Sequence, residues 1–360
     1  MLSRNFAKMM GGYVFAFLLV LSWSVEVIHA SAGDTDLRYS FISCFGLDIR
    51  GCVRQCQETG CVGQRCFPNC NFSSDGELID RLWFMQEPLY LRWKKWDCQS
   101  DCRYYCMLDR EKEKELLNLS PVKYHGKWPF RRIYGIQEPA SVGFSALNLA
   151  MHFHGWVSFF ILIYYKLPLK DGKRPYYEYS GLWHIYGLLS LNSWFWSAVF
   201  HSRDVDLTEK LDYSSAVILL GYSLILAILR TFSIRDEATR VMVAAPLIAF
   251  VTTHVMYINF YVLDYGWNMI VCVVMAVAQL AIWALWAGLS HHSSRWKLWV
   301  VVIAGGLAML LELYDFPPYQ GLWDAHALWH ATTVPLTYIW WSFIRDDAKF
   351  QTFNFVKKAK

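Results

Sequence analysis

The chain has 360 residues, of which 55% are hydrophobic, 17% aromatic and only 18% charged. A composition this apolar is unusual for a soluble protein of this length and indicates a polytopic membrane protein. The formal net charge of +4 is too small to suggest nucleic-acid binding, and the basic residues are spread over short loops, so we exclude a nucleic-acid partner.

Residues 1–32 have the layout of a secretory signal peptide. Arg4 and Lys8 precede an apolar core over 13–23, and small residues follow at Ala30, Ser31 and Ala32. The core is shorter than the about 20 residues that a membrane span needs, and an uncleaved anchor helix is the alternative. Cleavage here would place the following segment in the lumen of the secretory pathway.

Residues 33–143 form a polar, cysteine-rich segment that we expect to be a lumenal domain. Nine of the ten cysteines fall within it, at positions 44, 52, 56, 61, 66, 70, 98, 102 and 106. In an oxidising compartment such crowding favours disulfides, and zinc binding is the alternative. Because nine is odd, at least one of these thiols stays unpaired within the chain. Residues 71–73 and 118–120 match the acceptor pattern for N-glycosylation.

Seven apolar runs then fill the segment 144–344, and each is close to the length that crosses a bilayer. They cover residues 144–166, 180–201, 213–230, 241–262, 267–289, 297–316 and 323–344. If the cysteine-rich segment is lumenal, lysines and arginines gather in the cytosolic loops, as the positive-inside rule expects. The sequence therefore predicts an all-α membrane protein, a seven-transmembrane helix bundle with an N-terminal disulfide-rich lumenal domain.

Residues 345–360 are predicted to be a cytosolic tail. Lys357 and Lys358 have the spacing of a dilysine signal for retrieval to the endoplasmic reticulum. A basic flank held beside an anionic leaflet is the alternative interpretation of the same residues.

Polar residues with helical spacing lie at one predicted depth near the lumenal leaflet. Ser197 and His201 end the second run, His326 and His330 lie near the start of the seventh, and Asp212 directly precedes the third. Residues four apart share one face of a helix. Because polar groups at membrane depth are costly unless they serve a site, we expect these five side chains to line one cavity.

Three histidines and an open position are a frequent catalytic zinc site. Zinc lowers the pKa of a bound water towards about 7, so we predict Zn²⁺ at His201, His326 and His330. Asp212 is placed to orient that water or take its proton, and Ser197 to hydrogen-bond the water or the developing oxyanion.

The remaining polar residues of the spans have less specific interpretations. Glu312, Asp315 and Asp324 either hold imidazole rings in place or pair with nearby basic side chains. For the other histidines of the spans we expect helix packing, namely His152, His154, His184 and His254.

These residues resemble the conserved pattern of the CREST superfamily of membrane hydrolases, and within it the PER-like family of post-GPI attachment to proteins factor 3. Supporting stretches lie at 124–130, 137–141, 200–204, 313–318 and 324–326. The resemblance implies remodelling of GPI anchors by removal of the sn-2 acyl chain, a phospholipase A2-type reaction. It also implies GPI-anchored proteins and membrane lipids as partners, in membranes of the endoplasmic reticulum or the Golgi apparatus.

Two other functions are compatible with the same residues. A ceramidase-like lipid amidase would use the same metal site on an amide bond, although a large cysteine-rich domain suits a protein-attached substrate better. A seven-span receptor or trafficking factor would use its histidines only for helix packing.

Overall fold

The computed structural model describes residues 49–70, 96–124, 126–170 and 172–359. The predicted signal peptide, Cys44 and the acceptor site at 71–73 lie outside the described residues. The chain forms two compact units. Among the described residues, the cysteine-rich unit comprises 49–139 and 316–324, and the helical unit comprises 140–315 and 325–359.

The described part of the cysteine-rich unit contains two helices, α3 (Ile49–Thr59) and α5 (Cys98–Leu116). Between them, β1 (Cys61–Val62) pairs antiparallel with β2 (Arg65–Cys66). Asp97 caps α5 by accepting a hydrogen bond from the backbone N–H of Ser100 at 2.7 Å. The prediction of disulfides is confirmed for eight cysteines, which form the bonds Cys52–Cys106, Cys56–Cys102, Cys61–Cys66 and Cys70–Cys98.

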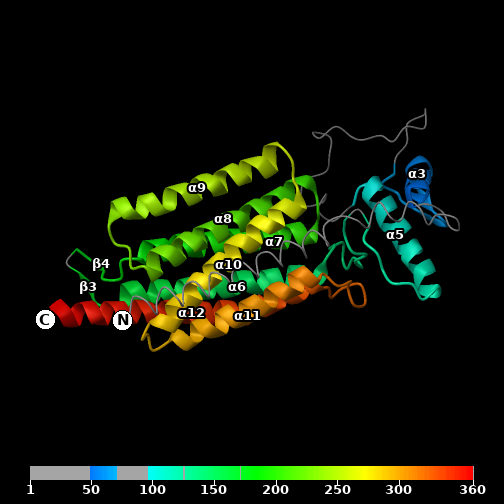
Figure 1. Cartoon of the computed structure of the whole chain (residues 1–360). Coiled ribbons are helices and arrows are strands. Elements are labelled where there is room, and N and C mark those ends of the chain that lie inside the picture. The colour runs from blue at the N-terminus through cyan, green and yellow to red at the C-terminus, as the bar shows by residue number, and fades with distance from the viewer. Residues whose placement is uncertain (1–48, 71–95, 125, 171, 360) are drawn as a thin grey trace, which may run out of the picture. The chain divides into compact units, whose positions relative to one another are not determined.

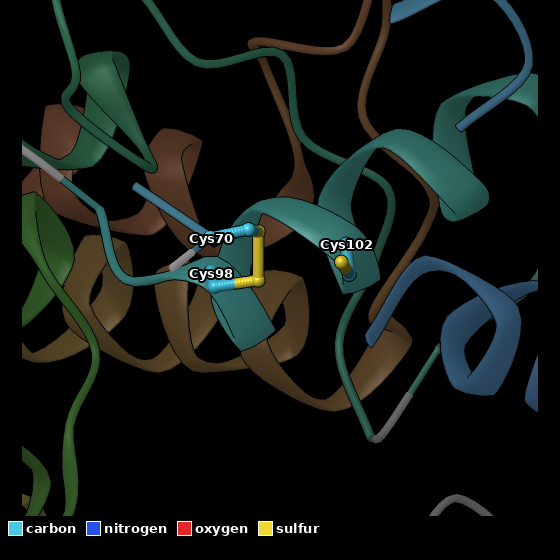
Figure 2. A group of neighbouring side chains, drawn as sticks. All are labelled: Cys70, Cys98 and Cys102. Carbon is cyan, nitrogen blue, oxygen red and sulfur yellow. A yellow bond between two sulfur atoms is a disulfide. The ribbon is translucent and has the colours of Figure 1, made fainter. Parts of the chain in front are cut away.

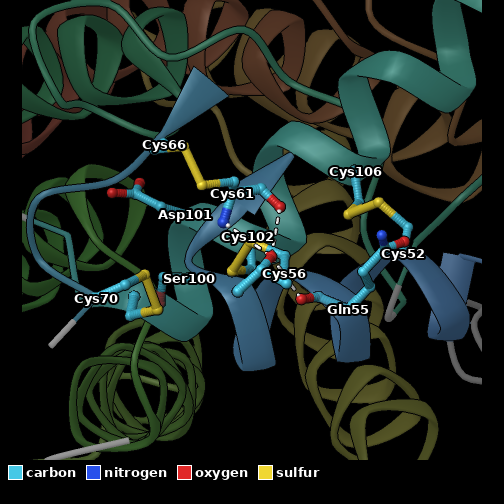
Figure 3. Close-up of a disulfide and its surroundings, with 12 residues drawn as sticks. Cys52, Gln55, Cys56, Cys61, Cys66, Cys70, Ser100, Asp101, Cys102 and Cys106 are labelled. Carbon is cyan, nitrogen blue, oxygen red and sulfur yellow. Dashed lines mark hydrogen bonds between the residues drawn. A yellow bond between two sulfur atoms is a disulfide. The ribbon is translucent and has the colours of Figure 1, made fainter. Parts of the chain in front are cut away.

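Two of these disulfides, Cys52–Cys106 and Cys56–Cys102, link α3 to α5 (Figure 3). Cys52 and Cys56 are four residues apart on α3, and Cys102 and Cys106 are four apart on α5, so each pair lies on one helix face. Cys56 and Cys102 are fully buried in a small core with Phe67. In the described part of the unit, these covalent links stabilise a core of few apolar residues.

The helical unit contains a long helix at each predicted apolar run, and Figure 1 shows these helices lying side by side. They are α6 (Pro139–Ile161), α7 (Ser180–Ser202), α8 (Asp206–Thr231), α9 (Glu237–Phe260), α10 (Tyr265–Leu289), α11 (Arg295–Tyr314) and α12 (Ala325–Ala359). A π-helical turn, η2 (Leu162–Lys166), extends α6, and β3 (Leu169–Lys170) pairs antiparallel with β4 (Arg174–Pro175).

In the part of the chain that the structure describes, five helices are long and apolar enough to cross a membrane. These are α6 with its π-helical turn, α8, α9, α10 and α11. The chain is therefore a largely helical protein with several span-like helices. Helices α7 and α12 coincide with the second and seventh predicted runs but are not among the five, so the number of seven spans stays a prediction.

Two helices extend beyond the predicted runs. The third run is predicted to begin at residue 213, but α8 begins at Asp206, where the backbone N–H of Val205 donates to the Thr208 hydroxyl at 3.0 Å. Asp212 therefore lies inside the helix rather than before it. Helix α12 does not end near residue 344 but continues through Ala359.

Aromatic side chains form the core of the helical unit. Trp183 and Trp341 are each 1% exposed, and neighbouring rings pack edge to face, as between Trp283 and Trp340 with centroids 5.2 Å apart. Gly155 lets α6 approach this core closely, because a Cβ atom there would lie only 2.2 Å from Cγ of Trp341. Helices α6 and α12 are thus packed side by side.

Candidate metal centre

Three imidazole rings converge between α7 and α12. His201 lies in the last turn of α7, and His326 and His330 lie in the first two turns of α12. Nε2 of His326 is 3.2 Å from Nε2 of His201 and 2.8 Å from Nε2 of His330. One nitrogen from each ring lies within 4.8 Å of the other two, so the three histidines form a group that could hold a metal ion.

The spacing of these nitrogens suits zinc. Zinc–nitrogen bonds of about 2.0–2.1 Å at tetrahedral angles place two ligand nitrogens about 3.3 Å apart. The observed separations of 2.8 and 3.2 Å are slightly shorter, so a small outward movement of the rings would accommodate the ion. His201 and His330 are 3% and 1% exposed, whereas the side chain of His326 is 32% exposed, which leaves one side of the group accessible.

The outward-facing nitrogens of two rings have acceptors that would fix their orientation. Nδ1 of His326 lies 2.6 Å from a carboxylate oxygen of Glu312, at the end of α11. Nδ1 of His330 lies 3.0 Å from the hydroxyl of Ser145 on α6. A proton on each Nδ1 would leave the Nε2 lone pair directed at the centre of the group. Histidine ligands of metals in proteins commonly have such outer partners.

The two residues predicted to assist the chemistry lie in different surroundings. Ser197 is 7% exposed, one turn before His201, and its hydroxyl lies 3.0 Å from that of Ser145. Asp212 is half-buried in the second turn of α8. Among the described residues, the group of potential ligand atoms consists of the three histidines, so Asp212 is not a fourth member of it.

The structure assigns partners to other polar residues of the spans as well. Glu312 contacts His326, which is the first of the two roles expected for it. His152 accepts a hydrogen bond from Nε1 of Trp341 at 3.2 Å, and His254 pairs with Asn268 at 3.0 Å, so both make the helix-packing contacts expected for them.

Ser145 and Asn148 lie beside the histidines but are not identified by the sequence reasoning. Nδ2 of Asn148 donates to the backbone oxygen of His330 at 2.9 Å. A signal for these residues exists in the sequence, because polar side chains recur along the first apolar run at helical spacing, at positions 141, 145, 148 and 152. That pattern predicts a polar helix face turned towards other helices.

A second group of potential ligands lies in the cysteine-rich unit, but its sulfurs are already bonded. Sulfur atoms of Cys70, Cys98 and Cys102 lie within 4.8 Å of one another. Figure 2 shows the bond between Cys70 and Cys98, and Cys102 is bonded to Cys56. Zinc requires thiolates, so these oxidised residues do not form a metal site.

Comparisons with known proteins place the chain in a family. A sequence model of the Per1-like family matches residues 88–348. A zebrafish (Danio rerio) protein named GPI-specific phospholipase A2-like PGAP3 is 36% identical over 322 residues, 89% of this chain and 91% of its own. The human (Homo sapiens) protein of that name is 32% identical over 338 residues, covering 93% and 95% of the two chains. The Protein PER1 homolog of Schizosaccharomyces pombe is 34% identical over 344 residues, covering 94% and 93%. The chain belongs to the Per1-like family.

Proposed function

We propose that this chain remodels GPI anchors by removing the sn-2 acyl chain through zinc-dependent ester hydrolysis. The observation that carries the proposal is the convergence of one nitrogen each from His201, His326 and His330 within 4.8 Å. The name GPI-specific phospholipase A2-like, given to relatives that match along about nine-tenths of this chain, supports the substrate class and the type of bond.

Each residue of the site has a separate role in this proposal. The ion would be held by His201, His326 and His330, and when bound it would act as a Lewis acid and lower the pKa of a bound water. Asp212 accepts the proton of the attacking water, and Ser197 donates a hydrogen bond to the oxyanion that develops on the ester carbonyl. The accessible side of His326 is the side on which a lipid ester would approach.

The proposed location follows from the proposed topology. With the cysteine-rich unit in the lumen, the ends of α7 and α12 that carry the histidines lie near the lumenal leaflet, where the lipid of a GPI anchor resides. We therefore propose a multi-pass protein of the endoplasmic reticulum or Golgi membrane. Its partners are GPI-anchored proteins, with membrane lipid around the site.

The test combines two measurements on cells and purified protein. In cells that lack the endogenous activity, the wild-type chain should release the sn-2 acyl chain of a GPI-anchored reporter, measured by lipid mass spectrometry, and the purified protein should contain one zinc. His326→Ala should lose most of the zinc and essentially all release, because three protein ligands leave no redundancy.

A matched control is His254→Ala, which removes a buried membrane histidine outside the group. It should keep both zinc and acyl release. If His326→Ala instead kept full zinc content and full release, the proposed metal site would be wrong, and the non-enzymatic interpretation would gain support. Release of a fatty acid from ceramide rather than from the reporter would favour the lipid amidase.

A further inference from the structure

The first helix of the helical unit presents a buried polar stripe that the proposed chemistry does not use. Four polar residues of α6 are at most 5% exposed although the helix is long and apolar enough to cross a membrane: Ser141, Ser145, Asn148 and His152. Their spacing of three or four residues puts them on one face. Such a stripe is costly in a membrane helix unless it contacts polar groups of its neighbours.

Two members of the stripe contact His330, one at its ring and one at its backbone. The hydroxyl of Ser145 lies 3.0 Å from Nδ1 of the ring, and Nδ2 of Asn148 donates to the backbone oxygen at 2.9 Å. Ser145 is 0% exposed and His330 is 1% exposed, so water does not compete for these bonds. Helix α6 thus fixes both the backbone and the ring of one histidine of the group.

Ser145 also lies 3.0 Å from the hydroxyl of Ser197 on α7. A serine hydroxyl has one proton to donate and two lone pairs to accept with. If Nε2 of His330 faced a metal, Nδ1 would carry the proton and donate a hydrogen bond to the Ser145 hydroxyl. The Ser145 hydroxyl could then donate its own hydrogen bond to Ser197. The proton of Ser197 would remain available for a hydrogen bond to another acceptor.

We propose that Ser145 is a positioning residue of the metal centre. It holds His330 in the tautomer that presents Nε2 to the ion, and it orients the hydroxyl of Ser197 as a donor. This inference rests on the proposed function and deepens it, because it explains how an apolar span without a metal ligand contributes to the site.

The consequence for metal binding can be stated as a fold-change. Ser145→Ala would leave the Nδ1–H of His330 buried without its acceptor, which favours a rotated ring or the wrong tautomer. Loss of an outer partner of a metal-bound histidine typically lowers metal affinity by about 10- to 100-fold. We expect a decrease of that size for Ser145→Ala.

Ser141→Ala is the matched control. Ser141 lies one turn away on the same stripe and is 1% exposed, and its hydroxyl has no hydrogen-bond partner among the residues that the structure describes. The full-length variants are purified, and zinc affinity is measured by competition with a graded series of chelators. Ser141→Ala should match the wild type. Ser145→Ala should lose its zinc to chelators whose zinc affinity is about 10- to 100-fold lower than that needed for the wild type. If Ser145→Ala does not fold, Ser145→Cys gives the same comparison, because a thiol of similar size is a weak acceptor.

A second readout separates positioning from mere packing. If Ser197 is oriented through Ser145, Ser197→Ala should cost much less acyl release in the Ser145→Ala background than in the wild type. Wild-type zinc affinity in both Ser145 variants would overturn the inference alone. A wild-type chain that holds no zinc would overturn the proposed function and the inference together.

Discussion

At the scale of single residues, the carboxylate of Glu312 is an outer contact of the histidine group that can be tested separately from Ser145. Its carboxylate lies 2.6 Å from Nδ1 of His326 and would stabilise that ring as a metal ligand. Glu312→Ala should lower zinc affinity by about 10- to 100-fold. Glu312→Gln should lose less, because its amide oxygen still accepts from Nδ1–H. Chelator competition measures both values, and an equal loss in the two variants would show that the charge rather than the hydrogen bond matters.

Asp212 and Ser197 should affect turnover more than metal content. Asp212→Asn keeps the shape of the side chain but cannot accept a proton, so acyl release should fall by about 10²–10⁴-fold while zinc largely remains. Ser197→Ala should cost less, since a hydroxyl that only donates a hydrogen bond is easier to replace. Zinc content and acyl release measured on the same preparations check this. Loss of zinc in Asp212→Asn would instead make the carboxylate a ligand.

The sequence predicts the histidines and misses Ser145 for a physical reason. A pair of imidazoles four residues apart in an apolar run is a rare and costly pattern, so it is visible without any structure. Placing a single serine in a membrane helix costs little free energy, because its hydroxyl can hydrogen-bond to a backbone carbonyl of the preceding turn. Its role depends on which helix packs against α6, and spacing along a single helix does not contain that information.

At the scale of elements, a buried ion pair joins α8 to α12. The guanidinium of Arg230 donates two hydrogen bonds to the carboxylate of Asp347, and the Tyr177 hydroxyl donates to the same carboxylate at 2.6 Å. Arg230 and Asp347 are 2% and 1% exposed. Burial and the charge of Asp347 hold the pKa of Tyr177 well above its usual range, so the tyrosine keeps its proton for this bond.

Removing one partner of this pair should be more damaging than removing both. Asp347→Ala leaves a buried guanidinium without its anion, which typically costs about 3–5 kcal/mol. The double variant Arg230→Leu with Asp347→Leu should recover much of that loss, because apolar residues of similar size can replace such a pair. Thermal unfolding of purified protein in detergent measures the difference. A double variant no more stable than Asp347→Ala would contradict it.

The same pair lies just beyond the end that the sequence predicts for the seventh apolar run. Hydropathy predicts that the seventh run ends at residue 344, because charged residues follow at Arg345, Asp346 and Asp347. Helix α12 continues past this point, where Asp347 pairs with Arg230 and Asp346 pairs with Lys297, whose Nζ lies 2.6 Å from its carboxylate. Charges that end a span in the sequence here pair with charges on other helices.

At the scale of the whole molecule, the predicted topology can be tested directly. In sealed microsomes, the cysteine-rich unit should resist added protease, whereas an epitope placed after Lys360 should be removed. Detergent that opens the vesicles should make the cysteine-rich unit accessible and serves as the control. Digestion of this unit in intact vesicles would invert the topology and place the histidine group at the other leaflet.

The two helices that hold the histidines have a consequence for how the chain is made. Helices α7 and α12 carry the histidine group, and they are not among the five described helices that are long and apolar enough to cross a membrane. The free energy of inserting a segment into the lipid bilayer depends on its apolar character, so α7 should insert inefficiently by itself. It is made before α12, whose two histidines complete the group. We expect α7 to stay in contact with its apolar neighbours α6 and α8 until α12 has been synthesised. Membrane insertion of α7 and assembly of the histidine group would then be coupled during biosynthesis of the protein.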